Sequence, residues 1–419
     1  MFKKIIYSFF LILLFSSCKE EKKGRDSQFD WLDRKAISNK NIPINNDNQV
    51  QLNVEQYVEQ KLKISDVISN FSFLSLKENI NKIGNIDKIL FNDDYVFLLD
   101  KYTTESLHLF DRKNGEQIIV FNEHGRGPTE FTSIYDFDVD YKNKEIYIFD
   151  GENLKCLKYS FDGRFIISER LPFRIGNIRK LRTGGFVNFP QHAPNFHFGD
   201  FFSDKDIIVT DSLLVPKYGG FTFNQNAVIN DFYSRDYFGF NNDTLSYFPR
   251  FKNQIYELNR KEKGYEFISL VKFDLGNYEI PNEDFVMEAS KFISNRRKDN
   301  KLFSNGNHFV SNNWIGTSFR NFGGIDFSVF YDRRSERVFA GTGFEFDFKG
   351  LPFFGFPTAI NKNECVTVID NSLIHQYKNI SDKNKQYYID NQVWSHEMDS
   401  LMLNIEDTES PVLLFYNLK

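Results

Sequence analysis

The chain has 419 residues, 41% of them hydrophobic, and a net charge of -5 from 52 basic and 57 acidic side chains. No stripe of Lys and Arg breaks this balance, which argues against a nucleic-acid partner, because nucleic-acid binders take most of their affinity from neutralising phosphates. Aromatic residues reach 17%, with 48 Phe, and because Phe and Tyr favour half-buried strands, the composition predicts an all-β protein.

The first 17 residues are typical of an export signal. Two lysines give a positively charged start, residues 5–15 are apolar except for one serine, and a pair of serines stands directly before Cys18. This apolar run is shorter than the ~20 residues that a membrane-spanning helix needs. The small pair before a cysteine resembles the lipobox of bacterial lipoproteins, which implies that residues 1–17 are removed and Cys18 is lipidated. A plain secretory signal is the alternative.

The residues after Cys18 predict where the protein is sent. Lys19, Glu20 and Glu21 resemble the signal that directs Bacteroidota lipoproteins to the outside of the outer membrane. We therefore expect attachment to the lipid bilayer through acylated Cys18, with the protein exposed on the cell surface or, alternatively, facing the periplasm. Residues 18–49 are polar and without periodicity, which predicts a flexible stalk.

After the stalk the sequence becomes strand-like and repetitive. Residues 95–100 (YVFLLD) are echoed by 145–150 (EIYIFD) at an offset of 50, and residues 107–111 return at 157–162 with an offset of 51 at the Phe-Asp pair. A third copy of the second pattern begins near Val329. One unit therefore contains about four short strands in roughly fifty residues.

Repeats of this length, each a small antiparallel sheet, indicate a β-propeller. No blade can bury both faces alone, so blades stack radially, and closure of the ring removes the exposed end. The sequence predicts a six-bladed propeller of four-stranded antiparallel blades over residues 50–419, with strand clusters near 83–122, 134–172, 178–215, 236–274, 307–342 and 356–379. The segment 64–76 is expected to supply a strand to the last blade and so fasten the ring.

Two local features complete this outline. Residues 281–295 predict a short helical insertion, with Phe285, Phe292 and neighbouring apolar residues on one stripe and acidic residues in the first turn. Cys156 and Cys365 lie inside strand-like runs, where a cysteine is usually a small buried hydrophobe. A disulfide between them is the alternative.

The repeats also resemble the six-bladed propeller lipoproteins of Bacteroidota, which are similar to NHL-repeat propellers. The resemblance depends on segments 125–131 (GRGPTEF), 136–140 (DFDVD), the strand ending at Asp150, and 406–413 (EDTESPVL). It implies a fold and an envelope location more than a reaction.

Segment 125–131 is the strongest candidate for a ligand site in the sequence. It links the outer strand of one blade to the inner strand of the next, on the face where propellers usually bind ligands, and its glycines allow unusual backbone angles. Arg126 and Glu130 are expected to reach the channel mouth as a cation and an acceptor. Alternatively, the two side chains pair with each other or with backbone groups and lock neighbouring blades.

Two aspartates extend this candidate site. Asp100 and Asp150 end equivalent strands and should occupy equivalent places on that face, near Asp138 and Asp140 of the adjacent inner strand. The predicted ligand-binding group is therefore Arg126, Glu130, Asp100 and Asp150. A ring of carboxylates could hold Ca²⁺, although aspartates at such positions more often cap a turn by accepting backbone N–H bonds. No other metal or cofactor is predicted.

Other chemistry has weaker support. His192 and His197 flank four residues, which is poor spacing for zinc, and no serine lies in a nucleophile motif. Aromatic-rich loops at 196–202 and 344–356 could stack on sugar rings, although core packing explains most Phe residues.

Together these features predict a membrane-anchored lipoprotein whose propeller is a non-catalytic binding or scaffolding module. Its partner would be an unidentified protein, glycan or small molecule. Two alternatives remain open: a propeller enzyme of lyase, hydrolase or lactonase type acting at the channel mouth, and a partner or sensor module of an outer-membrane uptake system. A carboxylate or histidine converging on Arg126 and Glu130 would favour the enzyme, and a channel plugged by Phe and Leu would favour the scaffold.

Overall fold

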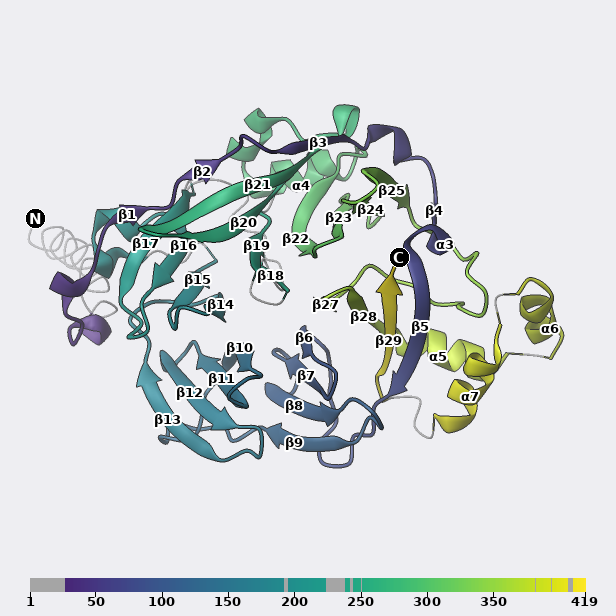
Figure 1. Cartoon of the computed structure of the whole chain (residues 1–419), viewed down its shortest axis with the longest axis horizontal. Helices are drawn as coiled ribbons and strands as arrows, with labels where there is room; N and C mark the ends of the chain where they lie inside the picture. Colours follow the sequence, from purple (N-terminus) through teal and green to yellow (C-terminus); the bar gives the residue numbers. More distant parts are fainter. Residues whose placement is uncertain are drawn as a thin grey trace, which may run out of the picture.

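The chain folds into a ring of six small antiparallel sheets. The computed structural model describes residues 27–191, 195–223, 238–241, 244–249, 251–380, 382–392, 394–405 and 410–419. Seen down the short axis of the protein, the sheets radiate from a common centre, and each places one strand innermost (Figure 1). The structure confirms the predicted all-β class, the six blades and the four-stranded plan of each blade.

The blades follow one another in chain order, and the strands of each blade are given from innermost to outermost; blade 6 takes its outermost strand from the segment that precedes blade 1. Blade 1 contains β6 (Lys88–Phe91), β7 (Tyr95–Asp100), β8 (Ser106–Asp111) and β9 (Gln117–Phe121). Blade 2 contains β10 (Ile134–Asp140), β11 (Glu145–Asp150), β12 (Lys155–Ser160) and β13 (Phe165–Arg170). Blade 3 contains β14 (Asn177–Lys180), β15 (Phe186–Phe189), β16 (Lys205–Thr210) and β17 (Pro216–Thr222).

The second half of the ring repeats this plan. Blade 4 contains β18 (Phe238–Asn241), β19 (Thr244–Tyr247), β20 (Gln254–Lys261) and β21 (Gly264–Asp274). Blade 5 contains β22 (Phe303–Val310), β23 (Trp314–Arg320), β24 (Asp326–Asp332) and β25 (Arg337–Thr342). Blade 6 contains β27 (Ala359–Asn361), β28 (Glu364–Ile369), β29 (Val412–Leu418) and β5 (Ile68–Ser75).

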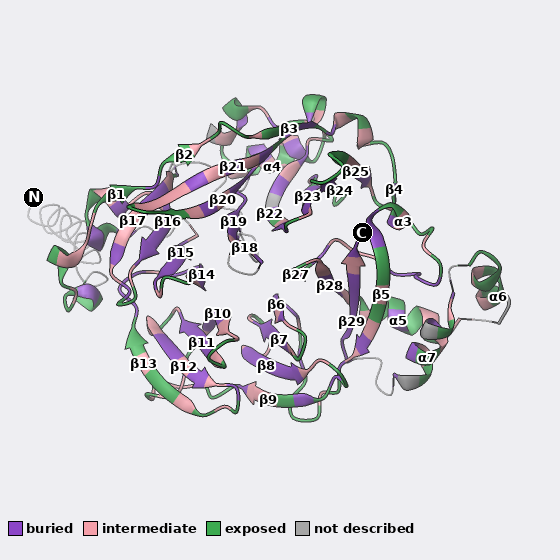
Figure 2. Cartoon of the chain, in the orientation of Figure 1, coloured by how far each residue is buried: buried purple, intermediate pink, exposed green. Residues whose placement is uncertain are grey.

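The cores lie between neighbouring blades, which explains both the continuous apolar runs and the aromatic excess. The middle strands β7 and β11 are buried along almost their whole length because a blade covers each of their faces, whereas the outermost strand β13 is largely exposed (Figure 2). Between blades 1 and 2, Phe97 meets Phe161 edge-to-face with ring centroids 5.2 Å apart. Such edge-to-face contacts stabilise the core beyond the free energy gained from burying apolar area alone.

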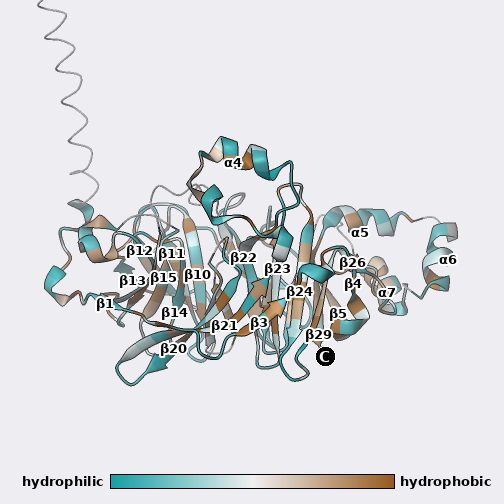
Figure 3. Ribbon diagram, turned by 90° about the horizontal axis from the view of Figure 1, so that it is seen from above, coloured by the Kyte–Doolittle hydropathy of each residue, from teal (hydrophilic) through white to brown (hydrophobic). Residues whose placement is uncertain are grey.

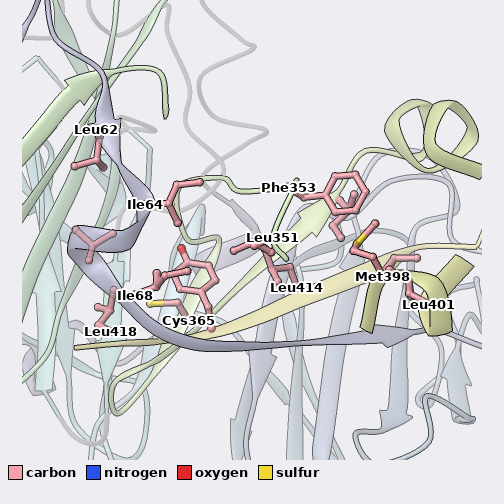
Figure 4. Close-up of a cluster of buried hydrophobic side chains, with 14 of the residues drawn as sticks. Leu62, Ile64, Ile68, Leu351, Phe353, Cys365, Met398, Leu401, Leu414 and Leu418 are labelled. Carbon is pink, nitrogen blue, oxygen red and sulfur yellow. The ribbon is translucent and has the colours of Figure 1, made fainter. Parts of the chain in front are cut away.

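The N-terminal strand β5 closes the ring, as predicted. It pairs antiparallel with β29, from Val412 opposite Ser75 to Leu418 opposite Ile68. Figure 4 shows the core at this closure, where Leu62, Ile64 and Ile68 pack among residues of blade 6. Closure therefore joins the start and the end of the propeller by both backbone pairing and apolar burial.

The structure differs from the expected flexible stalk over residues 27–49. Residues 40–63, the N-terminal strap, follow the outer rim of the ring (Figure 1): β1 (Lys40–Asn41) runs parallel to β17, and β2 (Ile44–Asn45) and β3 (Val50–Asn53) run parallel to β21. β4 (Leu62–Lys63) pairs with β26 (Phe344–Glu345). An outermost strand presents unpaired N–H and C=O groups, and the strap satisfies them with its backbone. Of its side chains only Ile42, Leu52, Val54 and Leu62 are buried, so most of the strap can stay polar, and its first part, up to residue 49, resembled a tether.

Helices are few and lie in the links. The predicted insertion is present as η9 (Asn282–Val286), a 3₁₀ turn, and α4 (Ala289–Arg296). A second insertion, α5 (Asn371–Lys378), α6 (Asp382–Asp390) and α7 (His396–Asn404), separates β28 from β29. In the side view, α4 and α5 lie on the same side of the disc (Figure 3). The remaining short turns are η2 (Ser27–Phe29), η3 (Arg34–Ala36), η4 (Glu55–Tyr57), α3 (Ile64–Val67), η5 (Phe196–Phe198), η6 (Asp200–Phe202) and η8 (Gly276–Tyr278).

The sequence-based strand cluster at 356–379 is therefore wrong in its second half. Residues 371–378 are helical because Ile374 and Tyr377 recur at helical spacing and pack on the core of blade 6. The third strand of that blade begins only at Val412. Cys156 and Cys365 are buried free thiols, as the strand context predicted. In the part of the chain that the structure describes, no helix is long and apolar enough to cross a membrane.

Candidate functional site

Asp100 and Asp150 occupy equivalent places, as the repeat predicted, and both act as turn caps. Asp100 Oδ2 accepts the backbone N–H groups of Gly84 at 2.7 Å and Asn85 at 3.0 Å. Asp150 Oδ2 accepts the backbone N–H of Thr132 at 2.8 Å. Burial raises the pKa of Asp100, but its hydrogen bonds outweigh burial and the net shift is downward. Both carboxylates are fully buried and tie the chain entering a blade to the end of its second strand.

Glu130 and Arg126 do not pair with each other. Glu130 Oε2 accepts the backbone N–H of Gly127 at 2.8 Å and lies so close to Gly125 that a Cβ there would come within 1.9 Å of it. Lys155 Nζ donates to the Gly127 carbonyl at 2.9 Å, which fixes the loop to blade 2. Arg126 is exposed, and its side chain makes no hydrogen bond or ion pair within the described residues.

A cavity of about 930 Å³ lies at the centre of the ring, lined by the innermost strands of all six blades. None of Arg126, Glu130, Asp100 and Asp150 is among the described residues that line it. Ligand binding by these four residues stays a prediction, and the cavity offers a different set of groups.

The two halves of this cavity differ in chemistry. Blades 1 to 3 contribute its charged side chains, which are the cations Lys88, Lys142, Arg179, Lys180 and Arg182 and the anions Asp87, Asp138 and Asp140. Blades 4 to 6 contribute mainly apolar groups, which include Phe238, Phe240, Phe309, Phe356, Pro357 and Ile360. An amphipathic lining of this kind fixes the orientation of a bound molecule.

Alternate aspartates of β10 connect blade 2 to blade 3. Asp136 Oδ2 accepts the backbone N–H of Ile178 at 2.8 Å, and Asp138 Oδ2 accepts that of Lys180 at 2.6 Å. Residues two apart on a strand point to the same side, so the DFDVD spacing aligns these carboxylates with the free N–H edge of β14. The motif that supported the family resemblance is thus a contact between blades.

Asp136 also lies at the centre of a buried charge bridge across three blades. Lys88 Nζ of blade 1 is 2.5 Å from Asp136 Oδ1, and an Arg179 guanidinium nitrogen of blade 3 is 3.1 Å from Oδ2. All three side chains are buried. Burial by itself raises the pKa of Asp136, but the two cations hold it below its usual range. Sequence reasoning missed Lys88 and Arg179 because only the stacking of three successive blades around one axis brings them together.

A second polar group lies at the far end of β10 and β14. Lys180 Nζ donates to Asp140 Oδ2 at 2.8 Å and to the Tyr147 hydroxyl at 2.7 Å. Although burial opposes it, the hydrogen bonds from Lys180 and Asn143 lower the pKa of Asp140. Burial raises the pKa of Asp138, with Arg179 and Lys88 opposing the shift.

The only histidine among the described lining residues is His308 of blade 5. Its Nδ1 lies 2.7 Å from the Gly306 carbonyl and must donate to it, and its Nε2 lies 2.9 Å from Ser246 Oγ. Ser246 is buried and does not itself line the cavity.

The remaining sequence candidates are structural or lie outside the described residues. His192, Cys18, Lys19, Glu20 and Glu21 are outside the described ranges. His197 stacks on Phe29 with ring centroids 3.6 Å apart. In the aromatic-rich loop 344–356, Phe353 is buried in the core and Phe356 reaches the cavity. Among the described residues, no three His, Cys, Asp or Glu side chains are grouped to hold a metal ion, and Ca²⁺ binding stays a prediction.

The chain is similar to solved structures. A "Putative exported protein" from Bacteroides fragilis has a TM-score of 0.67 at 17% identity, over 90% of this chain and 99% of that chain. A member of the duf4221 family from Bacteroides vulgatus has a TM-score of 0.47 at 9% identity, over 84% of this chain and 97% of its own. Virginiamycin B lyase from Staphylococcus aureus has a TM-score of 0.36 at 11% identity, over 69% and 78%.

The likeness to the Bacteroides fragilis protein shows the fold alone. Among curated proteins, no sequence matches this chain. The domain of unknown function DUF4934 matches residues 48–417, nearly the whole of the propeller, and the chain therefore belongs to the DUF4934 family.

Proposed function

We propose that this protein is an exported, lipid-anchored binding module that holds its ligand in the central cavity without transforming it. The observation that supports this most is the cavity itself. Its volume of about 930 Å³ falls within the ~300–1,000 Å³ of ligand sites, and it has one polar and one apolar wall. A channel filled by Phe and Leu would instead have supported a purely scaffolding disc.

The contacts of the cavity side chains favour binding over catalysis. Asp136 is shared between two cations, Asp140 is bonded to Lys180, and both nitrogens of His308 have partners. Asp138 is the group whose raised pKa would suit an acid-base role. Its two carboxylate oxygens, however, accept the backbone N–H groups of Val139 and Lys180. The enzyme alternative would require Asp138 to leave one of these bonds.

The anchoring part of the proposal comes from the sequence. Cys18 follows an apolar run and a pair of small residues, and the charged residues after it resemble a surface-export signal. One acyl chain binds a membrane only marginally, so a lipoprotein anchor with several chains would be needed for stable attachment. We place the propeller at the outer membrane on the exposed side. Service as the partner or sensor of an outer-membrane uptake system is compatible with this placement.

A cavity-blocking variant tests the binding proposal. Thr358 lines the cavity and is exposed, so Thr358→Trp should fill the space without disturbing a core. Leu213→Trp is the matched control, because Leu213 is 79% exposed and not among the lining residues. Melting temperatures are measured with neutral and acidic oligosaccharides, aromatic acids and short peptides.

A ligand at a hundred times its Kd should stabilise the protein by ~2.7 kcal/mol, which a melting curve detects. At least one compound class should raise the melting temperature of the wild type and of Leu213→Trp but not of Thr358→Trp. Stabilisation that persists in Thr358→Trp would place the ligand elsewhere and refute the proposal.

A further inference from the structure

We infer that the ligand of the central cavity is an organic anion in which a carboxylate is attached to a ring. This inference rests on the proposed function and adds the chemical class of the ligand. It follows from the charge of one wall of the cavity and the aromatic character of the other.

The charged wall has an excess of cations although the protein as a whole is anionic. Five cationic and three anionic side chains line the cavity, whereas the chain has a net charge of -5. Asp140 is matched by Lys180, and when Asp136, which lies behind the wall between Lys88 and Arg179, is counted as well, five cationic side chains still face four anionic ones. An excess of positive charge in a concave, partly dry site raises the local concentration of anions.

Lys142 is the cation best placed to receive an anionic group. It lies in the turn after β10, is exposed, and forms no hydrogen bond or ion pair with any described residue. Arg182, in the turn after β14 of the next blade, lines the same cavity. Its planar guanidinium can bind a carboxylate through two parallel bonds, which a lysine cannot do. Together the two turns place a guanidinium group and an ammonium group at one side of the cavity.

The opposite wall offers flat apolar surface. Phe356 lies with its ring centroid 5.8 Å from that of Phe309 and 5.6 Å from that of Phe330, so its ring is held in place by its neighbours. Phe240 of blade 4 lines the same wall and is half-buried. Among the described lining residues, blades 4 to 6 contribute no Lys, Arg, Asp or Glu side chain. A ring with an apolar face packs on such a surface, and its carboxylate then points to the cationic wall.

Two sources share this chemistry, namely acidic sugars and aromatic carboxylic acids. Titration calorimetry with trigalacturonate, its methyl ester, galactotriose and 4-hydroxybenzoate separates them. Trigalacturonate or 4-hydroxybenzoate should bind at least tenfold more tightly than the two uncharged sugars, and the difference should shrink as salt is raised from 20 to 500 mM because screening weakens the charge term.

Matched variants identify the cations. Lys142→Met and Arg182→Gln should each weaken binding of the acidic ligand about tenfold, the usual size of one lost charge-assisted bond. Lys144→Met is the control, because Lys144 lies in the same turn but is not among the lining residues; its affinity should stay within twofold of the wild type.

The failures can be told apart. If the uncharged sugars bind as tightly as the acids and Thr358→Trp abolishes both, the binding function stands and the anion inference is overturned. If no probe binds in a manner sensitive to Thr358→Trp, both are overturned. Equal loss in Lys142→Met and Lys144→Met would also overturn the inference, because it would show a general charge effect rather than a site.

Discussion

Acidification is expected to destabilise blade 1 through His108, which is fully buried in a chain of hydrogen bonds. Thr104 Oγ1 donates to Asp100 Oδ2 at 2.9 Å, and the Thr104 and Ser106 hydroxyls are 2.5 Å apart. Ser106 must therefore donate to Thr104 and accept from His108 Nε2, 2.6 Å away. Gln117 Nε2 donates to Nδ1 at 2.8 Å. A second proton on the ring, at Nδ1, would point at the Gln117 donor, and this hydrogen bond would be lost.

The size of the effect follows from the pKa. Burial lowers the pKa of His108 from 6.5 to about 4, with Asp100 opposing the shift. Below pH 6.5 His108 binds a proton in the unfolded chain but stays neutral in the folded chain until the pH approaches 4. Neutral His108 therefore makes its full contribution to the free energy of unfolding above pH 6.5, and this contribution is lost as the pH falls towards 4. At ~1.36 kcal/mol per pKa unit, the loss between pH 7.5 and 4.5 is about 2 to 3 kcal/mol.

Two measurements check this reasoning. The ring proton signal of His108, assigned by its absence in His108→Gln, should titrate near pH 4 while the protein is folded. The urea midpoint of the wild type should fall between pH 7.5 and 4.5 more steeply than that of His108→Gln. His375→Gln, at an exposed histidine, should keep the wild-type slope. A His108 pKa above 6, or equal slopes in all three proteins, would refute the argument.

Three further outcomes are expected. Asp136→Asn should lower the free energy of unfolding by about 3 to 5 kcal/mol, because it leaves the buried Lys88 and Arg179 without their counter-charge; urea unfolding measures this, and a loss below 1 kcal/mol would contradict the charge bridge. A chain starting at Gly84 lacks β5 and should be insoluble or melt much lower, since one blade keeps an unpaired edge; melting like the full propeller would refute closure by β5. Cys18→Ala should move the protein from the membrane to the soluble fraction, and unchanged incorporation of a labelled fatty acid would contradict lipidation at Cys18.

The repeat predicted where two of the expected ligand-binding residues lie, although it did not predict their role. The offset of 50 placed Asp100 and Asp150 at equivalent strand ends, and the structure puts them there. Their carboxylates cap turns, which was the structural alternative to ligand or Ca²⁺ binding. Whether a carboxylate binds a ligand or a backbone depends on which N–H groups lie near it, and a strand pattern does not contain that information.

The sequence by itself determined the features that depend on local order. Alternating and continuous apolar runs at a fixed offset specify blades, because a strand buried on both faces needs apolar residues throughout. A strand-like segment ahead of the first blade then predicted closure through β5. Both signals come from residues close together in the chain, and both are confirmed by the pairing.

Tertiary structure alone decided the strap, the late third strand of blade 6 and the cavity. The strap of residues 40–63 is held by backbone pairing that runs from Lys40 opposite Tyr218 to Leu62 opposite Phe344. Because only Ile42, Leu52, Val54 and Leu62 of its side chains are buried, the strap gives a weak strand signal. Lys88, Asp136 and Arg179 meet only because three successive blades turn their first strands to one axis. The pairing of these charges depends on how neighbouring blades stack, and no single stretch of sequence specifies it.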